Sequence, residues 1–437
     1  MHGDVSVKLK TLLHWCRNHP LSVSVGILII ATILAALVLI PVRSSIPGVR
    51  TQYSDSLAHI KHILGDTIKP HSPLFDFTGK TREGRRINIA IIGVDSRISD
   101  PTKHADANHV LSIIPDSGKI EIISIPRDTP CDLGFPDSLM NLNSITNTYA
   151  LRGQERYFQE LSRITGVGNI HYWIEIGFSQ AMGVIEWLGF SSPKQTLRVL
   201  RSRKGLGGDD YQRSYNQGQF IRQIIIKHLH RFDGIMGDLY MRAGLSLLNT
   251  NLTAEEAKGI LEQLETSGFT SSQPERITVE LVPEFTGKLM INDFTNEKVI
   301  DSLNKRVDNF SKYLEENDTL PPPPKVDVYT RLQNMLRLAE QDSMRPKSVI
   351  ERLERSFEQR AWLQVSDSAQ RSIIRHRFDA QLTHAYYLLK RPADAERVRK
   401  ITLAEQALHS LRNNVRTTQI RSTTSTMPTP VASPSRQ

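Results

Sequence analysis

The sequence predicts an α/β domain, with helices on both faces of a sheet, between an N-terminal apolar segment and an all-helical C-terminal region. Two observations favour this fold class. In the middle of the chain, short apolar runs typical of buried strands alternate with segments of helical periodicity. A run of four prolines at residues 321–324 then marks a domain boundary before a long helical stretch. The 437 residues are enough for two or three domains.

The first element is an uncharged apolar stretch at residues 21–42, which is long enough to cross a hydrocarbon core of about 30 Å as a helix. It is too long for a cleaved signal peptide, and no A-x-A site follows it. We expect a cytoplasmic tail at 1–20, one transmembrane helix at 21–42 in the cell membrane, and the bulk of the chain outside the cytoplasm. The net charge of +9 then favours anionic partners other than nucleic acid.

The segment after the membrane span, residues 43–86, contains an amphipathic helix at 51–66 and a polar linker. The α/β domain is expected at residues 87–312. Predicted strands lie at 87–92, 110–114, 120–125, 171–176 and 277–282, and predicted helices at 157–164, 178–188, 220–232 and 253–264.

The C-terminal part divides into a Pro-rich linker at 313–327, a helical domain at 328–412 and a disordered tail at 413–437. The helical domain is basic, and either an anionic wall polymer or a partner protein could bind it. Its predicted core positions are Leu332, Leu336, Leu353, Phe357, Phe378, Leu382, Tyr386 and Leu389.

Charged residues gather where the predicted strands end. Asp95 and Arg97 follow the first strand, Arg127 follows the third, and Asp106 lies just ahead of the second. Ligands of open α/β sheets bind beyond the carboxyl ends of strands. These positions therefore indicate a ligand site at one edge of the sheet.

A second group of charges lies at residues 197–219. Arg201 and Arg203 are two residues apart and would share one face of a strand, whereas Asp210 and Arg213 would share one face of a helix. Alone, each pair is more often a surface salt bridge worth about 0–1 kcal/mol. Several arginines packed together would repel one another unless an anion neutralised them, and guanidinium groups suit bidentate phosphate contacts.

Asp95 and Asp106 offer the oxygen ligands that Mg²⁺ takes in proteins, together with water and substrate phosphates. A metal ion and arginines around a pyrophosphate would stabilise the charge that develops during phosphoryl transfer. The chain has no Walker loop and no Gly-x-Gly-x-x-Gly after a strand, so a nucleotide substrate is not indicated.

Together these motifs resemble the LytR-CpsA-Psr family, over roughly residues 86–306. The family transfers glycopolymers from a polyprenyl-pyrophosphate carrier to a peptidoglycan sugar hydroxyl outside the cytoplasmic membrane, with Mg²⁺. The resemblance therefore implies this activity and an α-β-α sandwich. The motifs that carry it are, in chain order, GVDSR (93–97), HADANHV (104–110), IPRDT (125–129), LRVLRSR (197–203) and DYQRSYNQ (210–217).

The resemblance also implies roles for single residues. Asp95 and Asp106 would hold Mg²⁺ or Mn²⁺. Asp210 would orient Arg213 or act as the base on the acceptor hydroxyl, and with Arg127 these residues form the expected catalytic group. The residues expected to bind pyrophosphate are Arg97, Arg127, Arg201, Arg203 and Arg213, with Gln217 in support.

Two positions depart from the family pattern. Family members carry Arg-Ser-Asp-Thr where this chain has His104 to Ala107, and a second arginine where it has Asn216. Losing one guanidinium removes a charge-assisted bond of about 1.5–3 kcal/mol, equivalent to roughly 10–150-fold in rate. Two alternatives to the transferase stay open: a scaffold that binds a lipid-linked glycan without turnover, and a polyprenyl-pyrophosphate hydrolase.

Overall fold

The computed structural model describes residues 78–95, 103–135, 142–229, 234–270, 272–316 and 327–406. No helix within these ranges is long and apolar enough to cross a membrane. The predicted transmembrane helix at 21–42, the juxtamembrane helix, the proline run and the tail at 413–437 lie outside them.

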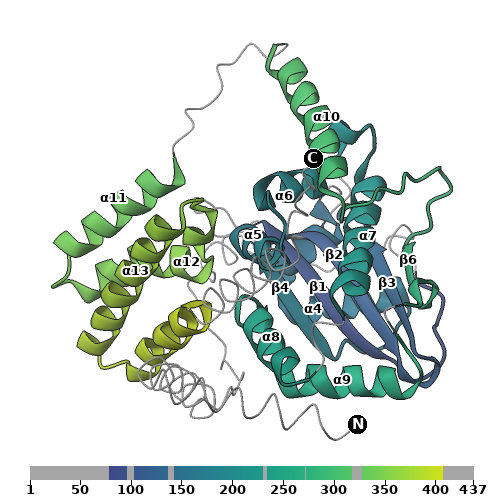
Figure 1. The fold of residues 1–437 in the computed structure, drawn as a ribbon, viewed down its shortest axis with the longest axis horizontal. Helices are drawn as coiled ribbons and strands as arrows, with labels where there is room; N and C mark the ends of the chain where they lie inside the picture. Colours follow the sequence, from purple (N-terminus) through teal and green to yellow (C-terminus); the bar gives the residue numbers. More distant parts are fainter. Residues whose placement is uncertain are drawn as a thin grey trace, which may run out of the picture. The chain divides into compact units, whose positions relative to one another are not determined.

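Six strands of the described residues form one mixed sheet: β1 (Ile87–Asp95), β2 (His104–Ile114), β3 (Lys119–Ile125), β4 (Tyr172–Gly177), β5 (Asn249–Thr250) and β6 (Ile277–Leu281). Their order across the sheet is β5-β4-β1-β2-β3-β6 (Figure 1). β1, β2 and β3 are antiparallel neighbours, while β4 and β6 run parallel to β1 and β3. β2 begins well ahead of the predicted start at residue 110, and β5 has no counterpart among the predicted strands.

Both faces of the sheet are apolar and covered by helices, as the sequence predicts. Ile92 of β1 belongs to the cluster beneath α4 (Ile145–Thr165), whereas Ile89, on the opposite face of the strand, packs with α7 (Asp210–His228) and α9 (Ala254–Thr266). Burying such a side chain fully contributes about 1.5–3 kcal/mol. The central apolar runs therefore form two cores, one on each side of the sheet.

The helices of the α/β part begin where local capping signals lie rather than where apolar periodicity begins. Asp209 caps α7, because its carboxylate accepts a hydrogen bond from the backbone N–H of Gln212 at 3.0 Å. The predicted capping box of Thr253 and Glu256 is present at the start of α9. The remaining helices are α5 (Phe178–Trp187), α6 (Pro193–Arg201), α8 (Gly234–Ser246) and α10 (Glu297–Glu316), and the last runs beyond residue 312 into the predicted linker.

The C-terminal region is helical, as predicted, and has a hydrophobic core of its own. Seven of the eight predicted core positions are fully buried there, and Leu389 packs against them. Its elements are α11 (Val328–Gln341), α12 (Pro346–Glu358), the 3₁₀ turn η7 (Ala361–Gln364), α13 (Ser368–Leu388) and a last helix at 392–406 (Figure 1).

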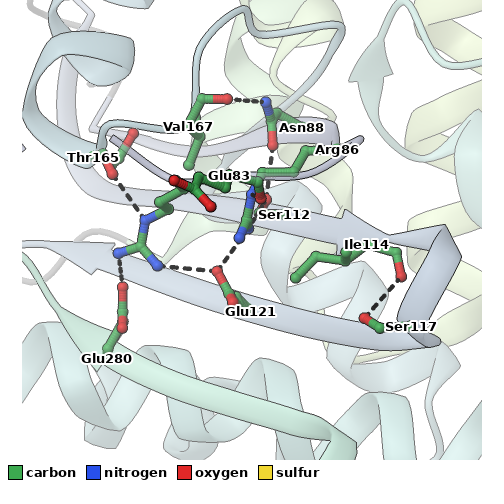
Figure 2. Close-up of polar contacts among 11 residues, drawn as sticks. Glu83, Arg86, Asn88, Ser112, Ile114, Ser117, Glu121, Thr165, Val167 and Glu280 are labelled. Carbon is green, nitrogen blue, oxygen red and sulfur yellow. Dashed lines mark hydrogen bonds and ion pairs between the residues drawn. The ribbon is translucent and has the colours of Figure 1, made fainter. Parts of the chain in front are cut away.

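A polar network anchors the segment ahead of β1 to the sheet, at the end opposite to the charged tip of that strand (Figure 2). Arg82 donates to Glu121 at 2.9 Å, to the carbonyl of Thr165 at 2.9 Å, and to Glu280. Arg86 donates to the same Glu121 carboxylate at 2.7 Å. One carboxylate on β3 therefore serves two partly buried guanidinium groups.

We expect Glu121→Gln to lower the free energy of unfolding by about 1–3 kcal/mol, because both arginines lose a charged acceptor in a partly buried setting. Urea unfolding of the purified protein measures the change. Glu83→Gln is the matched control, since the side chain of Glu83 is exposed and only its backbone carbonyl accepts from Arg86. Equal stability of the two variants would show that the network does not anchor the segment.

Candidate functional site

Strand ends and helix ends converge at one edge of the sheet. β1 ends at Asp95, next to the start of β2, and β3 ends beside Asn108 of the same strand. α6 ends at Arg201 and α7 begins at Asp210. We call the charged side chains gathered here the arginine–carboxylate cluster. Its members are Arg127, Arg201, Arg203, Arg213, Asp95, Asp106, Asp128 and Asp210.

A β-bulge places Asp106 in this cluster. Gly93 pairs with Ala107 and the next residue of β1 pairs with Ala105, so that Asp106 is the extra residue of β2. Bulges redirect a side chain at the rim of a sheet. The Asp106 carboxylate accepts a hydrogen bond from Nη1 of Arg127 at 3.0 Å. Asp106 therefore lies inside β2, and the predicted position ahead of the strand is wrong.

Arg201 and Arg203 do not share a strand, which corrects the sequence prediction. Pro193 opens α6 at a first-turn position, and the apolar residues that follow continue as a helix. Arg201 is its last residue. Its guanidinium lies 5.1 Å from the ring centroid of Phe178, and Nη2 lies 3.8 Å from Oδ1 of Asp95.

Asp210 is held between two arginines. Nη2 of Arg213 lies 2.8 Å from Oδ1, and Nη1 of Arg203 lies 3.0 Å from Oδ2. The predicted shared helical face of Asp210 and Arg213 is therefore confirmed. Arg213 is only 5% exposed, and it also donates to the backbone carbonyl of Asp106 at 3.3 Å. This last contact joins the start of α7 to β2.

Two neighbouring carboxylates in the cluster differ in proton affinity. Burial and a hydrogen bond with Asp210 raise the pKa of Asp128, against the opposing charges of Arg127 and Arg203. Burial works to raise the pKa of Asp210 as well. The hydrogen bond from Asp128 and the charges of Arg213 and Arg203 outweigh burial there, so the pKa of Asp210 is lowered. The proton that the pair shares therefore resides on Asp128.

The arginines of the cluster are neutralised by the chain itself. The sequence analysis expects an external anion to hold them together, but each one lies within 4 Å of a carboxylate oxygen. Arg127 illustrates the balance: burial lowers its pKa, the charge of Asp106 raises it, and the net shift is upward. An incoming anion must therefore take these guanidinium groups from their carboxylates.

The other predicted residues are placed less directly. Arg97 lies outside the described residues. Gln217 donates to the carbonyl of Leu200 at 3.1 Å and so holds the end of α6. Asn216 is buried and accepts from Gln212 at 2.9 Å. The position of the expected second arginine thus serves helix packing in this chain.

Sequence reasoning missed two residues beside the cluster. Gln212 pairs with the backbone N–H and C=O of Met290 at 2.8 and 2.9 Å, which holds the loop after β6 against α7. His109, read from the sequence as a strand-start residue, is 2% exposed and lies in the middle of β2. Its spacing of two from Leu111 and Ile113 is the signal that places it on the face toward α7.

The carboxylates of Asp95 and Asp106 fit a magnesium ion by their donor chemistry. They lie on neighbouring strands, and Mg²⁺ needs only one or two protein carboxylates when water and phosphate complete its octahedron. The described residues contain no group of three or more histidine, cysteine or acidic side chains that could hold a metal ion without such help.

Residues 53–189 match the model of the LytR_cpsA_psr family. No curated protein matches the sequence. Three solved structures are similar to part of the chain. TagV of B. subtilis is 20% identical, with 52% of this chain and 99% of that one covered and a TM-score of 0.37. The protein gbs0355 of Streptococcus agalactiae is 16% identical (51% and 88%, TM-score 0.37), and TagT bound to LI-WTA is 17% identical (56% and 94%, TM-score 0.32).

Proposed function

The chain belongs to the LytR-CpsA-Psr family through residues 53–189, and we propose that it transfers a glycopolymer from a polyprenyl-pyrophosphate carrier to a sugar hydroxyl of peptidoglycan. The family consists of cell-wall glycopolymer transferases, which supports the general activity. The observation that carries the proposal is the arginine–carboxylate cluster, in which four guanidinium groups from β3, α6 and α7 are held ready at one sheet edge.

The carboxylates hold the arginines in place before substrate binds. Pyrophosphate oxygens offer charge-assisted, bidentate contacts to guanidinium groups, so they compete with Asp106 for Arg127. The more exposed Arg201 and Arg203, at 43% and 38% of their side chains, can turn toward the ligand without leaving the protein surface. Binding is therefore an exchange of carboxylate for phosphate around side chains that are already in place.

In the proposed reaction the acceptor hydroxyl oxygen forms a bond to the phosphorus that carries the glycan. The bond from that phosphorus to the bridging oxygen breaks, polyprenyl phosphate leaves, and the hydroxyl proton passes to a base or to solvent. The arginines stabilise the charge on the phosphoryl oxygens. Asp210 orients Arg213 and Arg203 in this scheme, because its lowered pKa makes it a weak proton acceptor.

Asp95 and Asp106 would hold Mg²⁺ or Mn²⁺, and the ion would neutralise phosphate charge when bound. We expect Mg²⁺ to tighten binding of farnesyl pyrophosphate to the wild-type chain, and to have at most a twofold effect on the variant Asp95→Asn/Asp106→Asn. Isothermal titration of the full chain in detergent, with and without Mg²⁺, measures this. A similar gain in the variant would remove the metal from the proposal.

The proposal places the chain in the cytoplasmic membrane, with one span, its N-terminus inside and its catalytic part outside. The uncharged stretch at 21–42 supports this location. Peptidoglycan is then within reach of the cluster. The helical C-terminal region would bind wall polymer or a partner protein on the same side of the membrane.

The fate of the lipid substrate separates the proposal from its alternatives. The full chain in detergent is given a polyprenyl-pyrophosphate-linked glycan without acceptor and then with peptidoglycan, and the lipid product is followed by chromatography. The proposal predicts polyprenyl phosphate chiefly when peptidoglycan is present. Equal turnover without acceptor would identify a hydrolase, and binding without any turnover would identify a scaffold.

A further inference from the structure

His109 is a fully enclosed imidazole beneath the arginine–carboxylate cluster. It lies directly opposite Ser124 on β3, and its Nδ1 is 2.9 Å from the Ser124 hydroxyl. Its side chain is on the sheet face that α7 covers. A polar ring at such a position needs partners for both of its nitrogens, since an unpaired buried polar group costs about 1–3 kcal/mol.

α7 approaches the sheet very closely above this ring. A Cβ on Gly218 would lie 2.5 Å from the Ser124 hydroxyl oxygen and 2.8 Å from Cγ1 of Val279, so only glycine fits there. The preceding residue of α7, Gln217, uses its amide nitrogen for the carbonyl of Leu200. Its amide oxygen is left facing the interior.

Two buried atoms in this junction lack a hydrogen bond of standard geometry: Nε2 of His109 and Oε1 of Gln217. The two side chains nevertheless interact. Burial lowers the pKa of His109 to about 4, Gln217 acts in the opposite direction as a hydrogen-bond partner, and Arg213 adds to the lowering. The imidazole is therefore neutral at pH 7 and carries one N–H.

The amide oxygen of Gln217 can only accept, so pairing it requires the tautomer with hydrogen on Nε2. The Ser124 hydroxyl then donates to Nδ1, and every polar atom of the junction is satisfied. Arg213 lies one helical turn before Gln217 on α7 and contacts the backbone of Asp106, three residues before His109 on β2. The junction therefore lies where α7 and Arg213 meet the sheet.

We propose that His109 is a positioning residue of the cluster: it donates its Nε2–H to the amide oxygen of Gln217 and so fixes the start of α7, with Arg213, against β2. The consequence for pyrophosphate binding rests on the proposed function. The tautomer and the His109–Gln217 coupling do not.

The test begins with the junction itself. ¹⁵N NMR of the histidine side chains in the full chain at pH 7 should show His109 protonated on Nε2. His109→Leu and Gln217→Leu should each lower stability in urea, and the double variant should cost less than their sum, because both single variants break the same contact. The Nδ1–H tautomer, or additive effects, would overturn the proposal.

Farnesyl pyrophosphate then reports the effect on Arg213. We expect His109→Leu to weaken binding about tenfold, and His109→Gln, which keeps an N–H donor, to stay within threefold of wild type. If wild type binds the probe and His109→Leu binds equally well, positioning is disproved while the proposed function stands. If wild type does not bind the probe, the proposed function fails, and the tautomer and coupling still decide the role of His109.

Discussion

Replacing Arg127 by alanine lowers the rate of glycopolymer transfer by about 100–1,000-fold, the usual loss for one donor that stabilises transition-state charge. The guanidinium follows directly after β3 and is 25% exposed, so it faces both the protein and an incoming ligand. It pairs with Asp106 at 3.0 Å and with Asp128 at 3.4 Å. Its loss removes a phosphate donor and leaves Asp106 without its arginine.

Two further variants make this measurement specific. Arg127→Lys keeps the charge but loses the planar fork, and we expect an intermediate rate. Arg85→Ala removes an exposed arginine that pairs with Asp116 far from the cluster, and it should leave the rate unchanged. Initial rates are compared after thermal unfolding has shown that each variant is folded. A rate for Arg127→Ala within threefold of wild type would contradict the role assigned to this arginine.

The second large effect is a loss of stability in acid caused by His109. Its folded-state pKa is about 4, whereas an unfolded imidazole has a pKa near 6.5. Between these values the unfolded chain binds more protons, so stability rises with pH through this window and is lost as pH falls. Between pH 7 and pH 4 the expected contribution is about 3 kcal/mol.

Urea unfolding at several pH values measures this contribution as a difference between two proteins. His109→Gln removes the titrating group and keeps a donor, so its stability should fall less between pH 7 and pH 4 than that of wild type. The subtraction cancels the carboxylates that titrate in the same range, including Asp128. Parallel curves for wild type and variant would mean that the imidazole is not buried in its neutral form.

The parts of the fold that could be predicted are those with a local signal. β1 and β3 are nearly continuous runs of apolar, mostly β-branched residues, and α9 has its capping box in the sequence. α6 was harder, because its apolar residues read equally well as a strand until Pro193 is taken as a helix start. α7 begins ahead of its apolar stripe, at a cap that periodicity does not report.

The site could be predicted in composition but not in arrangement. Spacing alone paired Asp210 with Arg213, which the structure confirms. The bulge at Asp106 depends on strand register, which no local pattern specifies. The neutralisation of each arginine by a carboxylate from a distant segment, such as Asp106 for Arg127, is likewise a property of tertiary packing. His109 escaped notice because a buried histidine has no periodic signature of its own.

The measurement that tests the central claim most directly is covalent transfer. The full chain in detergent is incubated with a polyprenyl-pyrophosphate-linked glycan, labelled in the sugar, together with peptidoglycan and Mg²⁺. We expect the label to become bound to peptidoglycan through a phosphodiester, with polyprenyl phosphate released in equal amount, and both to fall together in Arg127→Ala. Label that stays on the lipid, or that is released without modifying peptidoglycan, would contradict the account.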